Sequence, residues 1–101
     1  MAGFVSVVKV SDIPPGQSKT VYIGGKGIAV FNVDGTFYAI DDTCLHRGGP
    51  LGEGELEGNV VTCPWHGWQY DVKTGASITN PAAKVSCYQT EVDGEDLRIS
   101  C

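Results

Sequence analysis

The sequence predicts an all-β domain built from antiparallel strands. Short runs rich in β-branched and aromatic residues recur along the chain, and glycine, proline or Asp-Gly turn signals separate them. No internal repeat, heptad or low-complexity tract is present. A chain of 101 residues is long enough for one compact domain and too short for two independent cores. We therefore expect a single domain over residues 1–101.

Four strands are expected before the first cysteine: residues 4–10, 20–23, 27–33 and 36–40. The first of them ends before Pro14-Pro15, because proline has no N–H for the hydrogen-bond ladder of a sheet. Gly24-Gly25 and Asp34-Gly35 supply the next two turns, since glycine adopts the positive φ angles that tight hairpins require. These strands are expected to form a four-stranded meander.

The second half of the chain is richer in turn signals. Glycines and a proline interrupt residues 48–58, so only a short strand over residues 59–62 is expected before Cys63. Thr79-Asn80-Pro81 breaks the chain again. Residues 85–92 and 96–100 then predict a last hairpin, which we expect to return to the first sheet.

Cysteine and histidine occur together in two short segments. Cys44-Leu45-His46 is followed, after sixteen residues, by Cys63-Pro64-Trp65-His66. Each segment offers one thiolate and one imidazole, which predicts a metal site made of Cys44, His46, Cys63 and His66. Two cysteines and two histidines can hold zinc tetrahedrally, but common zinc spacings pair like ligands. Here each segment is mixed, a pattern that fits a [2Fe–2S] cluster with thiolates on one iron and imidazoles on the other.

The pattern C-x-H-x₁₆-C-x-x-H, followed by Gly67, resembles the Rieske family. The resemblance implies one [2Fe–2S] cluster as cofactor, with Cys44 and Cys63 on one iron and His46 and His66 on the other. The outer iron with its two histidines is then the expected exit for the electron.

The resemblance is sharpest between Cys44 and Asp71, and it also implies a fold. Rieske domains have an antiparallel β-sandwich or barrel as their base and a cluster-binding lobe inserted into it. By this resemblance, residues 1–40 and 82–101 form the base, and the lobe covers approximately residues 41–81.

Rieske proteins of respiratory complexes resemble the motif but carry an extra cysteine in each loop, at positions matching Gly49 and Trp65 here, and a membrane anchor. This chain has neither cysteine, and no apolar run approaches the ~20 residues of a membrane helix. The resemblance is therefore closer to the soluble Rieske ferredoxins of bacterial ring-hydroxylating oxygenase systems. It implies a one-electron carrier with two partners, a ferredoxin reductase as electron donor and a terminal oxygenase as electron acceptor.

Several observations narrow the function. The chain has only two histidines and the motif uses both. None is left for a general base or a catalytic iron triad, so the protein is not expected to be an enzyme.

The net charge of −5 disfavours binding to nucleic acid and suits contact with basic patches of protein partners. With no signal peptide, the expected location is the cytoplasm. The protein is also expected to be a monomer. Cys87 and Cys101 are expected to remain reduced thiols.

Two other functions fit the sequence as well: the small Rieske subunit of a nitrite reductase-type complex, and a zinc-stabilised binding module.

A further expectation concerns the redox potential. In high-potential Rieske proteins a serine two residues after the second histidine, and a tyrosine two residues further on, both donate hydrogen bonds to the cluster. Here these positions are Trp68 and Tyr70, so we expect a potential towards the negative end of roughly −150 to +300 mV.

Overall fold

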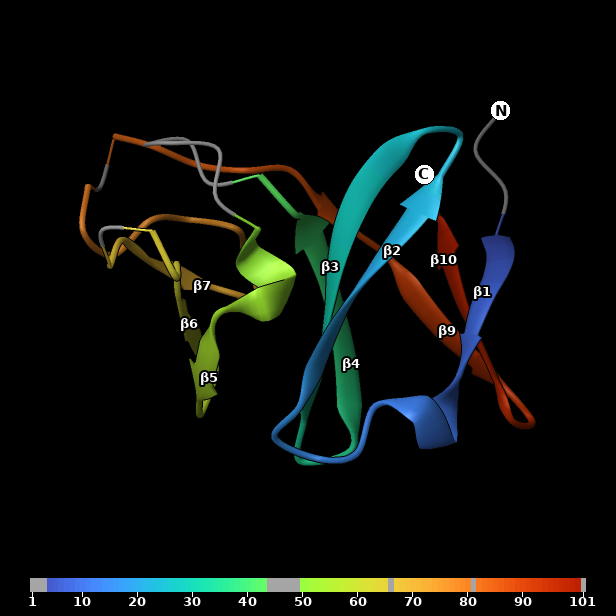
Figure 1. Ribbon diagram of the computed structural model, residues 1–101. Coiled ribbons are helices and arrows are strands. Elements are labelled where there is room, and N and C mark those ends of the chain that lie inside the picture. The colour runs from blue at the N-terminus through green and yellow to red at the C-terminus, as the bar shows by residue number, and fades with distance from the viewer. Residues whose placement is uncertain (1–3, 44–49, 66, 81, 101) are drawn as a thin grey trace.

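The computed structural model describes residues 4–43, 50–65, 67–80 and 82–100. These residues form strands β1 to β10 and two short 3₁₀ helices, arranged in three antiparallel sheets (Figure 1). The described residues contain no α-helix. The prediction of an all-β, antiparallel fold is therefore confirmed. Within the described part of the chain, no helix is both long enough and apolar enough to cross a membrane.

One sheet joins the two ends of the chain. It contains β1 (Phe4–Lys9), β10 (Asp96–Ser100) and β9 (Thr90–Asp93), in the order β1-β10-β9. The predicted four-stranded meander is thus wrong in its first strand, which pairs with β10 instead of the next strand along the chain. The reason is the 3₁₀ helix η1 (Val10–Asp12) and the prolines after it, which take the chain out of the first sheet before β2 begins.

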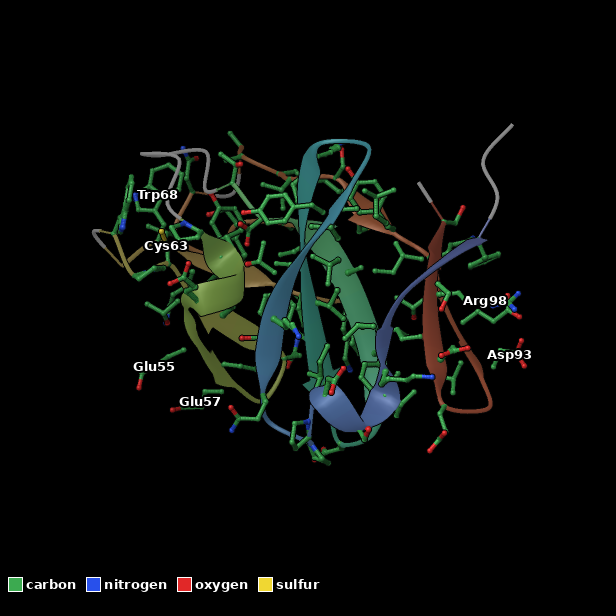
Figure 2. The ribbon with its side chains drawn as sticks, turned by 45° about the vertical axis from the view of Figure 1, so that its right-hand side comes forward. Glu55, Glu57, Cys63, Trp68, Asp93 and Arg98 are labelled. Carbon is green, nitrogen blue, oxygen red and sulfur yellow. The ribbon has the colours of Figure 1, made fainter. Side chains whose placement is uncertain are left out.

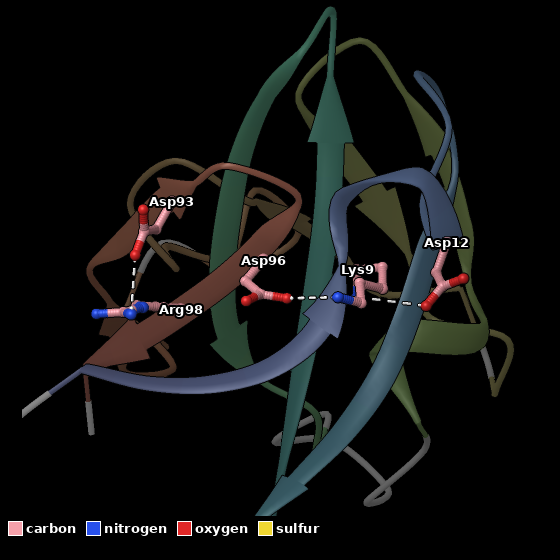
Figure 3. A network of polar contacts seen from close by, with 5 residues as sticks. All are labelled: Lys9, Asp12, Asp93, Asp96 and Arg98. Carbon is pink, nitrogen blue, oxygen red and sulfur yellow. Dashed lines mark hydrogen bonds and ion pairs between the residues drawn. The ribbon is translucent and has the colours of Figure 1, made fainter.

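This sheet carries two exposed ion pairs among the described residues. Lys9 Nζ lies 3.0 Å from Asp96 Oδ1, and Arg98 Nη2 lies 2.8 Å from Asp93 Oδ2 (Figure 3). The backbone N–H of Lys9 also donates to Asp12 Oδ2 at 3.3 Å. Exposed pairs of this kind contribute about 0–1 kcal/mol each, so they add solubility and little stability.

The central sheet holds the other predicted meander strands: β2 (Ser18–Ile23), β3 (Lys26–Val33) and β4 (Thr36–Asp41), with β8 (Cys87–Tyr88) next to β4. The two predicted turns are confirmed, because Gly24 and Gly25 have φ angles of 59° and 83°, and Asp34 and Gly35 have φ angles of 52° and 92°. Positive φ at both central positions matches the right-handed twist of the flanking strands.

The expected strand over residues 85–92 is wrong as a single element. It is two strands in different sheets, since Tyr88 of β8 pairs with Ala39 while Thr90 of β9 pairs with Ile99. Gln89 lies at the change of sheet, and its carbonyl accepts a 3.0 Å hydrogen bond from the N–H of Ser100. A chain that crosses between two sheets can keep its extended conformation while it changes partners, so the sequence pattern does not mark the crossing.

The third sheet contains β5 (Glu55–Glu57), β6 (Val60–Thr62) and β7 (Gln69–Asp71), and it lies between β4 and β8 in the chain. The 3₁₀ helix η2 (Leu51–Glu53) precedes it. Strand β6 matches the predicted short strand before Cys63, whereas β5 lies in the segment that glycines were expected to break. Figure 1 shows this sheet on the opposite side of the central sheet from β1, β9 and β10.

The central sheet separates two hydrophobic cores. Alternate residues of β3 point to opposite faces, so Ala29 and Phe31 belong to the core shared with the third sheet, and Ile28 and Val30 to the core shared with β10. Burying a side chain such as Phe31 contributes about 1.5–3 kcal/mol. The third sheet is therefore packed against the central sheet through a continuous apolar layer, which includes Leu51, Val61, Tyr70 and Val72.

Candidate functional site

Of the four predicted metal ligands, the structure describes Cys63. Cys44, His46 and His66 lie outside the described residues. Cys63 directly follows β6 and is 2% exposed. Its thiol belongs to the apolar core that also contains Val61 and Tyr70. The core thus fixes where the second ligand segment leaves the sheet.

The turn between β6 and β7 directs a backbone donor at the Cys63 sulfur. The N–H of Cys63 donates to the carbonyl of Trp68 at 2.7 Å, and the N–H of Trp65 donates to Cys63 Sγ at 3.4 Å. Gly67 has a φ of 76°, a conformation that side chains other than glycine rarely adopt. Backbone donors to a ligand sulfur are a recurring feature of iron–sulfur sites. The buried sulfur and its N–H donor fit the environment of a cluster thiolate.

Trp68 and Tyr70 lie on either side of Gln69, at the start of β7. Tyr70 is fully buried in the core that holds Cys63, and Trp68 is partly buried against the same core. Figure 2 shows Trp68 and Cys63 at the same end of the third sheet. Tyr70 thus packs in the same core as the predicted ligand Cys63.

The two ends of the first ligand segment, residues 44–49, are held together by described residues. Thr43 and Pro50 form an antiparallel bridge. The N–H of Leu51 donates to the carbonyl of Asp42 at 2.6 Å, and the N–H of Gly52 donates to Asp42 Oδ1 at 2.7 Å. The sequence did not indicate this role for Asp42, because an aspartate before a loop is usually solvated. Its burial depends on residues that are distant in the chain.

A second polar network fixes the end of β4, three residues before Cys44. Asp41 Oδ1 accepts a 2.5 Å hydrogen bond from the Tyr88 hydroxyl, and Asp41 Oδ2 accepts a 3.0 Å bond from the N–H of Ser86. Lys26 Nζ lies 3.5 Å from Asp41 Oδ1 and 5.0 Å from the centre of the Tyr88 ring. The network joins β3, β4 and β8.

This arrangement shifts the pKa values of Asp41, Tyr88 and Lys26. Partial burial would raise the pKa of Asp41, but the hydrogen bonds from Tyr88 and Ser86 and the charge of Lys26 outweigh burial and lower it. Burial and the Asp41 carboxylate raise the pKa of Tyr88. Tyr88 and Asp41 together raise the pKa of Lys26. At neutral pH the site therefore holds an ionised Asp41, a protonated Tyr88 and a cationic Lys26.

The indole of Trp65 is 51% exposed, although it precedes His66 directly in the chain. Pro50, at the end of the first ligand segment, is half-buried. Trp65 and Pro50 thus present partly exposed apolar side chains next to the two predicted ligand segments in the sequence. Apolar surface at such a position suits contact with a protein partner.

A model of the Rieske [2Fe-2S] domain matches residues 3–89. The chain belongs to the Rieske family. Ferredoxin CarAc of Metapseudomonas resinovorans is 37% identical over 99 residues, which cover 96% of this chain and 92% of that protein. The ferredoxin component of the naphthalene 1,2-dioxygenase/salicylate 5-hydroxylase systems of Ralstonia sp is 33% identical over 97 residues, with coverage of 95% and 91%.

A solved structure agrees with these relatives. One chain from a complex of reduced oxygenase and oxidized ferredoxin in carbazole 1,9a-dioxygenase superposes with a TM-score of 0.87 and 33% identity, over 96% of this Rieske protein and 92% of that chain. Family membership confirms the resemblance that the motif carried. It also decides between the two cofactors that the cysteines and histidines allowed, because the cofactor of a Rieske domain is one [2Fe–2S] cluster rather than zinc.

Proposed function

We propose that this Rieske protein is a one-electron carrier, which accepts electrons from a ferredoxin reductase and delivers them to a terminal oxygenase. The observation that carries the proposal is the match to ferredoxin components of dioxygenase systems over more than 90% of both chains. The bound cluster supplies the chemistry, the reversible uptake of one electron. The protein is thus an electron-transfer component and not a catalyst in its own right.

The proposed ligands are Cys44, His46, Cys63 and His66, with the two cysteines on one iron and the two histidines on the other. Their spacing supports this assignment, and so do the burial of Cys63 and the Trp65 N–H directed at its sulfur. We assign the cluster lobe to approximately residues 41–81. The position of the β5-β6-β7 sheet in the chain, between β4 and β8, supports that boundary.

The partner surface is proposed to lie where the two ligand segments reach solvent. The exposed Trp65 offers an apolar contact there, and the net charge of −5 favours partners with basic patches. Cys87, a described cysteine, is exposed and free. An exposed free thiol suits a reducing compartment, which supports a cytoplasmic location.

The proposal is tested first on the purified protein. We expect about two iron and two acid-labile sulfide ions per chain, a red-brown colour and a Rieske-type EPR signal after reduction. Electron transfer is then measured with the reductase and the terminal oxygenase of a carbazole 1,9a-dioxygenase system, each with its own ferredoxin as the reference. A colourless protein that contains only zinc would refute the cofactor. A loaded protein that neither partner reduces or oxidises would refute the carrier role.

A further inference from the structure

We propose that Asp42 is a positioning residue for the first ligand segment, residues 44–49. Its buried carboxylate fixes how far apart the two ends of that segment lie, and so where Cys44 and His46 enter the cluster site. The inference rests on the proposed ligand role of these two residues.

The contacts of Asp42 reach both ends of the segment. Asp42 lies two residues before Cys44 and is 8% exposed. Its carbonyl accepts a 2.6 Å hydrogen bond from the N–H of Leu51, and its Oδ1 accepts a 2.7 Å bond from the N–H of Gly52. One residue before the segment therefore holds two successive amides after it. The carbonyl oxygen and Oδ1 of Asp42 together fix the position of the chain at Leu51 and Gly52.

The same carboxylate attaches the segment to the central sheet. Asp42 Oδ1 also accepts a 2.9 Å hydrogen bond from the Thr20 hydroxyl of β2, and the N–H of Asp42 donates to the carbonyl of Gly27 at 3.2 Å. From the other side, the Ser18 hydroxyl donates to the carbonyl of Gly52 at 2.8 Å. The base of the ligand segment is thus fixed to β2 and β3 as well as closed on itself.

The backbone at Gly52 lies close to Thr20 and Asp42. A Cβ atom on Gly52 would lie 2.2 Å from Thr20 Oγ1 and 3.0 Å from Asp42 Oδ1. Real Cβ atoms do not approach other atoms as closely as 2.2 Å, so Gly52 is the residue that allows η2 to press against β2. Asp42, Thr20 and Gly52 form a close-packed joint of three parts, and we call these three residues the Asp42 joint.

The chemistry of the joint favours a carboxylate. Two donors, an N–H and a hydroxyl, meet at one oxygen, and a carboxylate accepts hydrogen bonds without offering a donor of its own. A buried carboxylate is costly unless it is satisfied in this way. An asparagine at this position keeps the shape but loses the charge that strengthens both bonds. Asp42→Asn is therefore the substitution that weakens the joint with the least change in packing.

The test compares wild type, Asp42→Asn and Asp93→Asn. Asp93 lies in the β9–β10 hairpin and pairs with Arg98 (Figure 3), so its substitution makes the same change in net charge away from the joint. Hydrogen exchange over residues 50–57, read by mass spectrometry, reports the Leu51 and Gly52 amides. Loss of the visible spectrum in chelator reports cluster release. We expect faster exchange and about tenfold faster release in Asp42→Asn alone, since residues that orient metal ligands typically contribute about 10–100-fold to metal affinity.

A second pair of variants keeps the test decisive if Asp42→Asn does not fold. Thr20→Val removes the hydroxyl and retains the shape, whereas Thr20→Ser keeps the hydroxyl. We expect Thr20→Val to show the same two effects, in smaller measure, and Thr20→Ser to restore wild-type behaviour. Wild-type exchange and release in Asp42→Asn, or in Thr20→Val where Asp42→Asn does not fold, would overturn the inference. A wild-type protein without iron would instead refute the proposed function, and with it the ligands that Asp42 is inferred to position.

Discussion

The hydroxyl of Tyr88 donates a 2.5 Å hydrogen bond to the carboxylate of Asp41, across 47 residues of sequence. Asp41 ends β4, three residues before Cys44, and Tyr88 lies in β8, which pairs with β4. A strand that follows the predicted cluster lobe thus holds the strand that leads into it. The contribution of this hydrogen bond to the free energy of unfolding should depend on whether Asp41 is ionised.

Tyr88→Phe removes the hydroxyl and should lower the free energy of unfolding at pH 7 by about 0.5–1 kcal/mol, because the bond is to a charged but partly exposed group. The folded-state pKa of Asp41 is lowered, so its contribution is present above the unfolded value of about 3.8 and is lost as the pH falls through the folded value. The difference between wild type and Tyr88→Phe should therefore shrink below about pH 4.

Urea unfolding at several pH values between 3.5 and 7 measures this dependence. Tyr22→Phe is the matched control, since Tyr22 is 73% exposed on β2. Equal stability of Tyr88→Phe and wild type at pH 7 would show that the Asp41 contact contributes nothing measurable.

His46→Ala and Cys63→Ser should each abolish the normal cluster, because assembly requires two sulfur and two nitrogen donors together. Visible absorption and EPR spectra of the purified variants give the result. Cys87→Ser is the control, and it should retain the wild-type spectra because Cys87 is exposed and free. A wild-type spectrum in His46→Ala would remove that residue from the ligand set.

Trp68→Ser should raise the midpoint potential, because a serine hydroxyl at this position can donate to the cluster and so stabilise its reduced, more negative state. One added hydrogen bond to a charged group is worth roughly 1.4 kcal/mol, or on the order of 60 mV for one electron. Tyr70→Phe should lower the potential or leave it unchanged. Protein-film voltammetry measures all three proteins.

Trp65→Phe serves as the control for the potential. Its side chain is exposed, and the backbone N–H that donates to Cys63 Sγ is retained in the variant. A wild-type midpoint well above zero would contradict the assignment to the negative end of the Rieske range, and with it the role of donor to an oxygenase.

Gly75→Ala should destabilise the protein more than Gly16→Ala. Both glycines have positive φ, 81° and 84° respectively, so both alanines carry the backbone strain of about 1 kcal/mol or more. At Gly75 a Cβ would also lie 2.3 Å from the carbonyl oxygen of Val85, whereas at Gly16 no atom lies within 4 Å. The melting temperature of each variant is compared with that of wild type. The difference between the two losses reports the effect of the close contact with Val85. Equal losses would mean that the Val85 backbone shifts without cost.

The sequence predicted the features of the fold that depend on residues close together in the chain. The turns at Gly24-Gly25 and Asp34-Gly35 could be read directly, because positive φ restricts the residue types that fit. The short strand that leads to Cys63 was predicted for a similar reason, since its β-branched residues lie between turn signals.

What the sequence could not predict depends on contacts between distant residues. The last hairpin was expected to return to the first sheet, but nothing local shows that β1 pairs with β10 and not with β2. The change of sheet at Gln89 leaves the strand pattern intact. Asp42 is buried because Thr20, 22 residues away, folds against it. A pairing that closes a long loop is specified by the whole core, not by a motif.

The neighbouring positions of Asp41 and Ser86 have a consequence for how such proteins can diversify. The N–H of Asp41 donates to the carbonyl of Ser86 at 2.9 Å, so the excursion that contains both predicted ligand segments leaves and rejoins the central sheet at one point. Loop-closure entropy grows only slowly with length, so segments of different sizes can be exchanged between these two strands at small cost. The cluster lobe is therefore a topological insertion, whose length can change without moving the two strands that hold its ends.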